Sequence, residues 1–199
     1  MRWLALLGLL ALAGCGGGSS ARTYVLSPPA EPLAGAVSQA GRPVIELRPV
    51  SIPDYMDTTD ILIRDGRNEF KASTTGRWGE RLSVGITQAL WVELSRRLPA
   101  FQIARTRPPG QPVAQLLIDV EAFDLFPDGR CVLSARWMVA AADRRTTLAS
   151  QRGTVTATAP SFGGAITDDA ATTAMAQAVG RLADDIAAVV PRAAGGGIP

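Results

Sequence analysis

Hydrophobic residues recur at every fourth position from Gly76 to Leu98, a period that is typical of one face of an α-helix. We predict a helix over this stretch, capped by Thr74 or Thr75 and ended by Pro99. Glu93 and Arg97 form a favourable i,i+4 pair on it. The apolar stripe consists of Trp78, Leu82, Ile86, Leu90, Leu94 and Leu98, with Val84 and Ala89 beside it.

A second helical pattern closes the chain. Thr167 stands where an N-cap is expected, and Asp168 and Asp169 follow in the first turn, where the helix dipole favours negative charge. Pro191 predicts the end of this helix, with 192–199 as a disordered tail. Its buried stripe is predicted to be Met175, Val179, Leu182, Ile186 and Val190.

Alternating hydrophobic and polar residues predict strands between these helices. The turn signal "DGRN" joins two of them into a hairpin, and a change of apolar face near Ala122 indicates a β-bulge. The predicted extended segments are 23–26, 43–50, 61–64, 69–73, 101–105, 114–126, 130–140 and 146–158. Two amphipathic helices packed on one face of a mainly antiparallel sheet form a two-layer α+β sandwich, within a single domain over 23–191.

The N-terminus has the layout of a secretory signal. Arg2 is followed by an apolar run that is too short to span a bilayer permanently and that ends in small residues. The tail of this run, "LAGC", resembles a bacterial lipobox, in which the cysteine is acylated after cleavage. The resemblance implies a signal peptide over 1–14, lipidation of Cys15, and a flexible tether over 15–22. Gly16 stands where an inner-membrane retention aspartate would stand, which favours the inner leaflet of the outer membrane.

Composition argues against several classes of function. Basic and acidic residues nearly balance, at 20 against 18, and the arginines are scattered, so nucleic-acid binding is not predicted. The chain has no histidine, the commonest metal ligand, and no carboxylate spacing typical of a cation loop. We therefore predict neither a metal nor a cofactor.

No constellation of catalytic residues emerges from the sequence. Cys131 alternates with Leu133 and Trp137 on an apolar strand face and has no histidine to activate it, so core packing is favoured over a reactive thiol. Adjacent aspartates such as Asp184 and Asp185 diverge by about 100° on a helix and do not converge on a substrate. We predict a protein that is not an enzyme.

A group of aromatic and basic residues has two interpretations. Tyr55 and Met56 lie in a proline-bounded loop, and Trp78 follows Arg77 at the predicted helix start. One interpretation is structural: Tyr55 packs on the domain edge and Trp78 attaches the helix to the sheet. The other is a partner-facing patch, because interfaces favour aromatic residues and arginine.

The chain resembles the PqiC/YmbA-type family of auxiliary lipoproteins of ABC-type transport systems. The resemblance rests on the lipobox, "YVLSPP", "IPDYMD…ILIR", "RWGERLSVGITQALWVELSRRLP", "DVEAFD" and "LSARWMV". One departure is "TTDILIR", where the family pattern has an arginine–proline pair. The family resemblance adds Arg64 to the candidate partner-binding residues, which are then Tyr55, Met56, Arg64, Arg77 and Trp78.

The resemblance implies a non-enzymatic role at the outer membrane. The lipid-anchored domain would dock a periplasmic MCE-domain protein whose assembly carries lipids or other amphipathic molecules between membranes and supports envelope integrity. The chain itself is a further candidate partner, as a homo-oligomer. The alternatives are a structural or assembly lipoprotein associated with an outer-membrane barrel or the cell wall, and a periplasmic enzyme with an unrecognised site.

Overall fold

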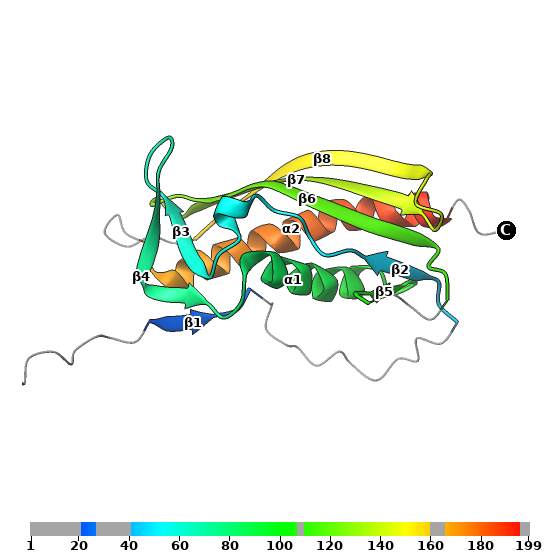
Figure 1. The fold of residues 1–199 in the computed structure, drawn as a ribbon, viewed down its shortest axis with the longest axis horizontal. Helices are drawn as coiled ribbons and strands as arrows, with labels where there is room; N and C mark the ends of the chain where they lie inside the picture. The colour runs from blue at the N-terminus through cyan, green and yellow to red at the C-terminus, as the bar shows by residue number, and fades with distance from the viewer. Residues whose placement is uncertain (1–20, 27–40, 107–109, 160–165, 196–199) are drawn as a thin grey trace, which may run out of the picture.

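The structure is a computed structural model that describes residues 21–26, 41–106, 110–159 and 166–195 (Figure 1). The predicted signal peptide, Cys15 and most of the predicted tether therefore lie outside the described residues. The first strand begins at Arg22, the last residue of that predicted tether. The elements are β1 (Arg22–Tyr24), β2 (Val44–Leu47), η1 (Asp54–Met56), β3 (Asp60–Arg64), β4 (Phe70–Trp78), α1 (Leu82–Arg97), β5 (Gln102–Ala104), β6 (Ala114–Leu125), β7 (Arg130–Ala141), β8 (Thr147–Thr158) and α2 (Asp168–Gly195).

The strands form two sheets. The large sheet has the order β5-β2-β6-β7-β8, and the small sheet has the order β1-β4-β3. The long ladders β6/β7 and β7/β8 are antiparallel, whereas β2 is parallel to both of its neighbours and β1 is parallel to β4. The predicted α+β class is confirmed. The prediction of one sheet was incomplete, because β1, β3 and β4 pair with one another instead of joining the large sheet.

Both helices lie on one face of the large sheet, as predicted (Figure 1). Helix α2 packs against β7 and β8, and α1 packs against α2 and β5. The sheet presents alternate residues to the helices, and the bulge predicted near Ala122 is present as a register shift between Val120 and Ala122. The buried residues of this face include Leu116, Ile118, Val120, Phe123, Leu125, Leu133 and Trp137.

Helix α1 begins six residues later than the Gly76 start that the sequence predicted. Thr74, Thr75 and Trp78 belong to β4, which pairs with β1 on one side and β3 on the other. Trp78 is nevertheless buried. The four-residue spacing of hydrophobic residues therefore continues by coincidence from the end of β4 into α1. Val84, which was placed beside the apolar stripe, is 50% exposed.

Helix α2 begins as predicted and ends later. The Thr167 hydroxyl accepts a hydrogen bond from the Ala170 N–H at 3.2 Å, which makes it the N-cap. The helix continues through Pro191 to Gly195, so the predicted tail is wrong for residues 192–195, and residues 196–199 lie outside the described part. The proline removes only one main-chain donor, and burial of Ala194 holds the last turn against the core.

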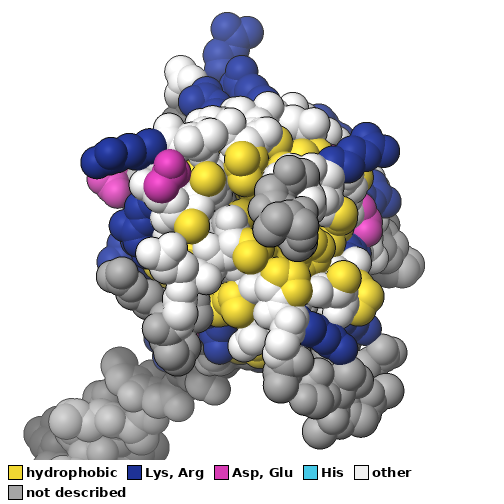
Figure 2. All heavy atoms as spheres, turned by 90° about the vertical axis from the view of Figure 1, so that its right-hand side faces the viewer, with side chains coloured by type: hydrophobic (Ala, Val, Ile, Leu, Met, Phe, Trp, Pro, Cys, Tyr) yellow, Lys and Arg dark blue, Asp and Glu magenta, His cyan; other side chains and the backbone are white. Residues whose placement is uncertain are grey.

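The two ends of the molecule differ. The small sheet, which includes β1, lies at one end, and the C-terminal end of α2 lies at the other (Figure 1). A helix of 28 residues is about 42 Å long, so α2 separates the two ends by roughly that distance. Figure 2 shows the end away from β1, where hydrophobic side chains gather between basic side chains.

Candidate partner-binding surface

Tyr55 lies on the surface in the short helix η1, in front of the β3–β4 hairpin. Its side chain is 53% exposed, which is unusual for a large aromatic residue in this fold. The ring packs against Phe70 at the start of β4, with the ring centroids 5.5 Å apart and the planes inclined by 34°. One face of Tyr55 is therefore supported by the domain while much of the side chain remains open to solvent.

Arg64, at the end of β3, holds this aromatic pair in place. Its guanidinium carbon lies 4.3 Å from the centre of the Phe70 ring, a cation–π contact. One terminal nitrogen donates to Asp124 Oδ1 at 2.9 Å, and the other donates to the Arg67 carbonyl at 2.9 Å. The Arg64 and Asp124 side chains are only 20% and 16% exposed, so their ion pair ties the small sheet to β6. Arg64 is thus a positioning residue for Phe70 and Tyr55.

The surroundings of Tyr55 keep its phenol neutral. Partial burial raises the pKa of Tyr55, the negative charge of Asp124 raises it further, and the positive charge of Arg64 opposes them. A neutral phenol both donates and accepts hydrogen bonds on an otherwise apolar ring. This combination is common at protein interfaces.

Met56 and Trp78 are core residues. Each is 3% exposed, and together with Phe123 and Met175 they line a cavity of about 10 Å³ between the two sheets and the helices. In this structure neither side chain is available to a partner, which corrects the partner-facing prediction for these two residues. Trp78 instead attaches the end of β4 to the core, as the structural interpretation held, and its indole Nε1 has no hydrogen-bond partner in the described part of the chain.

Arg77 is exposed and takes no part in the contacts among Tyr55, Phe70 and Arg64. It pairs in register with Thr23 on one side and Asp60 on the other, near the end of β4. Phe70 lies at the start of the same strand, seven positions earlier in the sequence. The structure therefore brings Tyr55 and Arg64 together through Phe70 and leaves Arg77 apart from them.

Asp57 is a functional position that the sequence analysis did not single out. Its Oδ1 accepts a hydrogen bond from the Ser83 N–H at 3.0 Å, and its Oδ2 pairs with Arg81 at 2.6 Å. Burial would raise the pKa of Asp57, but the hydrogen bonds from Ser83 and the charge of Arg81 outweigh burial and lower it. Asp57 therefore caps α1 from the Tyr55 loop. Its proximity to the helix start depends on tertiary structure, so no local signal identified it.

Cys131 is the free cysteine among the described residues and lies in the core. Burial, followed by the negative charge of Asp124, raises the pKa of its thiol to about 12. A thiol with such a pKa is almost entirely protonated at neutral pH and is a poor nucleophile. The predicted packing role of Cys131 is confirmed.

The described residues offer neither a metal-binding cluster nor a membrane-spanning helix. They contain no cluster of three or more histidine, cysteine, aspartate or glutamate side chains that could hold a metal ion. Of the helices built from them, none combines the length and hydropathy needed to cross a membrane.

Residues 24–187 match the family described as "ABC-type transport auxiliary lipoprotein component". The chain belongs to this family. The match includes the large sheet, the small sheet except the first two residues of β1, both helices except the end of α2, and the Tyr55–Phe70–Arg64 group. Cys15 lies before the matched region.

Two curated relatives are similar to this chain, both named "Intermembrane transport lipoprotein PqiC". They come from Escherichia coli strain K12 and Shigella flexneri. Each is 23% identical over 138 residues, which cover 69% of this chain and 73% of the relative.

Solved structures share the fold. One uncharacterised protein has a TM-score of 0.69 at 17% identity and covers 85% of this chain and 98% of its own. A protein from Xanthomonas campestris has a TM-score of 0.63 at 16% identity, covering 88% of this chain and 92% of its own.

Proposed function

We propose that this protein is a non-enzymatic lipoprotein of the outer membrane that docks a periplasmic MCE-domain assembly. The assembly would carry lipids or other amphipathic molecules between the two membranes and so support envelope integrity. The observation that carries the proposal is the family match over residues 24–187, which spans nearly the whole described domain. The relatives named as intermembrane transport lipoproteins also support a role in transport between membranes.

The proposed anchor is an acylated Cys15. Arg22 at the start of β1 is seven positions further along the chain, so the tether reaches at most about 25 Å from the membrane surface. Such a tether keeps the domain at high local concentration near one membrane, and this strengthens binding to a partner held at the same membrane.

The proposed docking surface is centred on Tyr55, with Arg77 as a separate exposed cation. Phe70 and Arg64 hold the Tyr55 ring before any partner arrives, and this lowers the entropy cost of binding. An aromatic residue that is held in place by its own domain and exposed on one side is typical of the residues that contribute most of the binding free energy at protein interfaces.

Co-purification tests the docking role. We expect the tagged full chain to capture the MCE-domain protein of the same genome after mild crosslinking, and Tyr55→Ala to reduce capture about tenfold without lowering thermal stability. Leu148→Ala is the matched control, because Leu148 is also an exposed apolar residue, at 40%, but lies on β8. Capture of an outer-membrane barrel instead of the MCE-domain protein, or equal capture by Tyr55→Ala, would contradict the proposal.

Fractionation tests the anchor. The Cys15→Ala variant should remain an uncleaved precursor, incorporate no radioactive palmitate and be absent from outer-membrane fractions. A Cys131→Ala variant should be processed and fractionate like the natural chain, because the Cys131 thiol is buried. A Cys15→Ala chain that is fully processed and bound to the outer membrane would overturn the anchor assignment.

A further inference from the structure

A groove of about 600 Å³ runs over the face of the large sheet that the helices leave open. Its walls come from the segment after β2 and from β6, β7 and β8. This volume is typical of small-ligand sites. The lining residues include Arg48, Pro49, Leu117, Asp119, Arg136 and Met138.

Strand register arranges the residues of the groove in two rows across the sheet. The first row is polar and places Ser51, Asp119, Arg136 and Arg152 side by side. The second row consists of Leu117, Met138 and Ser150. Glu46, Gln115 and Ala140, which the same ladders align beyond Leu117 and Met138, are buried and lie outside the lining of the groove. The two rows change from charged to apolar along the strands.

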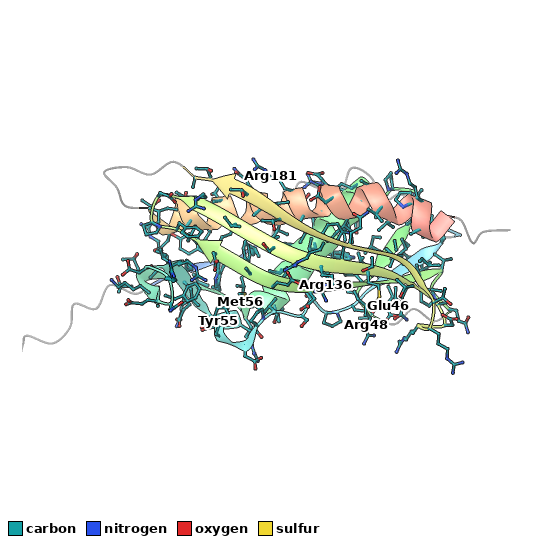
Figure 3. The ribbon with its side chains drawn as sticks, turned by 90° about the horizontal axis from the view of Figure 1, so that it is seen from above. Glu46, Arg48, Tyr55, Met56, Arg136 and Arg181 are labelled. Atoms are coloured by element: carbon teal, nitrogen blue, oxygen red, sulfur yellow. The ribbon has the colours of Figure 1, made fainter. Side chains whose placement is uncertain are left out.

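Arg136 and Arg48, on two sides of the groove, have guanidinium N–H groups that remain available to a ligand. Arg136 donates one hydrogen bond to Glu121 at 3.0 Å, and Glu121 also pairs with Arg152 at 2.6 Å. Arg48 donates to Glu46, which is 3% exposed, at 2.8 Å. The Arg136 and Arg48 side chains are 57% and 43% exposed, and a guanidinium has five N–H donors. Figure 3 shows Arg136 on this face, with Arg48 and Glu46 towards one end and Tyr55 towards the other.

Asp119 adds a charge of the opposite sign. It lies directly across from Arg136 in the ladder, yet Arg136 pairs with Glu121 instead. Within the described part of the chain, Asp119 is exposed and makes no ion pair. If the ligand carried only a phosphate, the negative charge of that phosphate would face the negative charge of Asp119. A ligand that also carries an ammonium group would place a positive charge near Asp119 and a negative charge near the arginines.

We infer that this groove binds a single-chain amphiphile with a zwitterionic phosphate headgroup, a lysophospholipid in chemical class. Its phosphate contacts Arg136 and Arg48, its ammonium contacts Asp119, and its chain lies on Leu117 and Met138. The polar row lies directly beside the apolar row, as the headgroup lies beside the start of the chain in such a molecule. The inference deepens the proposed function by naming a cargo class, and it rests on that function only for the supply of lipid.

Photo-crosslinking in cells tests this site with the full chain. A photoreactive amino acid is placed at Met138, at Leu117 or, as the control, at Gln177, which is exposed on α2 in the opposite layer. Cells are labelled with radioactive phosphate, and mass spectrometry identifies the adducts. We expect single-chain phosphoethanolamine adducts at Met138 and Leu117 and none at Gln177.

Variants test the two charges. Arg136→Gln should lower labelling at Met138 about tenfold, whereas Arg136→Lys should retain more of it. The Arg136→Gln variant should remain folded, because Glu121 keeps Arg152 as a partner. Its melting temperature checks this. Arg48→Gln is the second variant should Arg136→Gln unfold. Asp119→Asn should lower the phosphoethanolamine adduct selectively.

Four outcomes overturn the assignment. They are equal labelling at Gln177, unchanged labelling in a folded Arg136→Gln chain, adducts that are peptides, and adducts with only a phosphoglycerol headgroup. Partner capture by Tyr55→Ala is measured separately, so loss of lipid labelling and loss of docking are distinguishable results.

Discussion

At the scale of single residues, Asp57 couples the Tyr55 loop to the start of α1. The first four N–H groups of a helix have no partner within the helix, and the Asp57 carboxylate satisfies one of them from outside. The same carboxylate pairs with Arg81, the residue before the helix. One side chain therefore links the start of α1 to the loop that carries Tyr55.

Asp57→Ala should lower the free energy of unfolding by about 1–2 kcal/mol, measured by urea denaturation at pH 7. Because the folded-state pKa of Asp57 is lowered, its contribution is present above the unfolded-state pKa and is lost as pH falls through the folded-state value. The natural chain and the variant should therefore converge in stability in acid, below about pH 4. Asp185→Ala, which removes an exposed carboxylate of α2, is the control and should change little. A constant difference between natural chain and variant down to pH 2 would contradict this account.

Cys131 should resist alkylation in the folded protein. Its thiol is buried and its pKa is raised to about 12, so iodoacetamide at pH 8 should modify it only after unfolding. Mass spectrometry with and without urea makes the measurement. Rapid modification of the native chain at Cys131 would disprove the core assignment.

At the scale of elements, β4 meets α2 closely at Gly76. A side-chain carbon at this position would lie 2.6 Å from Asp168 Oδ2 and 2.9 Å from the Tyr24 ring. Asp168 cannot move freely, because it accepts a hydrogen bond from the Thr75 hydroxyl at 2.6 Å. The glycine therefore allows the small sheet to pack against the N-terminus of α2.

Gly76→Ala should destabilise the protein by about 1–2 kcal/mol, because either the Asp168–Thr75 bond or the Tyr24 ring must shift. Gly180→Ala is the matched control. Its new carbon would meet only Arg97 at 3.8 Å, inside a helix, so stability should rise by about 0.5–1 kcal/mol. Thermal unfolding of both variants measures the difference, and equal effects would show that the close contact is unimportant.

At the scale of the whole molecule, the Arg64–Asp124 pair joins the two sheets. The pair links the end of β3 to β6, and both side chains are mostly buried. Removing one member leaves the other charge buried without its partner, which costs more than the pair itself contributes. The orientation of the Tyr55 surface relative to the large sheet thus depends on this contact.

Asp124→Ala should lower the free energy of unfolding by about 3–4 kcal/mol, with a loss of near-ultraviolet signal from the aromatic group. The Lys71–Asp65 pair gives the comparison within the same hairpin, because its side chains are 65% and 41% exposed. Lys71→Ala should change the free energy of unfolding very little, because solvent screens this exposed pair. If the two variants were equally stable in chemical denaturation, the buried pair would not join the sheets as described.

Local patterns predicted the elements that depend on local chemistry. Three such predictions were confirmed: the Thr167 cap, the bulge near Ala122 and the burial of Cys131. Each depends on a pattern of only a few consecutive residues, namely a capping residue, a change of apolar face and an alternation of apolar and polar residues. The exposure of the candidate partner-binding residues was predicted in part. Tyr55 is exposed as a partner contact requires, whereas Met56 and Trp78 are buried, because exposure depends on what distant segments place above a side chain.

The sequence by itself determined the helices, most of the strands, the α+β class and the likeness to the auxiliary lipoproteins. Each of these follows from periodicity or motifs within short windows, where side chains and backbone interact directly. Only the tertiary structure decided the division into two sheets, the capping of α1 by Asp57 and the alignment of Asp119 with Arg136 in the groove. These features depend on pairing and register between segments far apart in the chain, and a one-residue slip in register would exchange the faces of a strand.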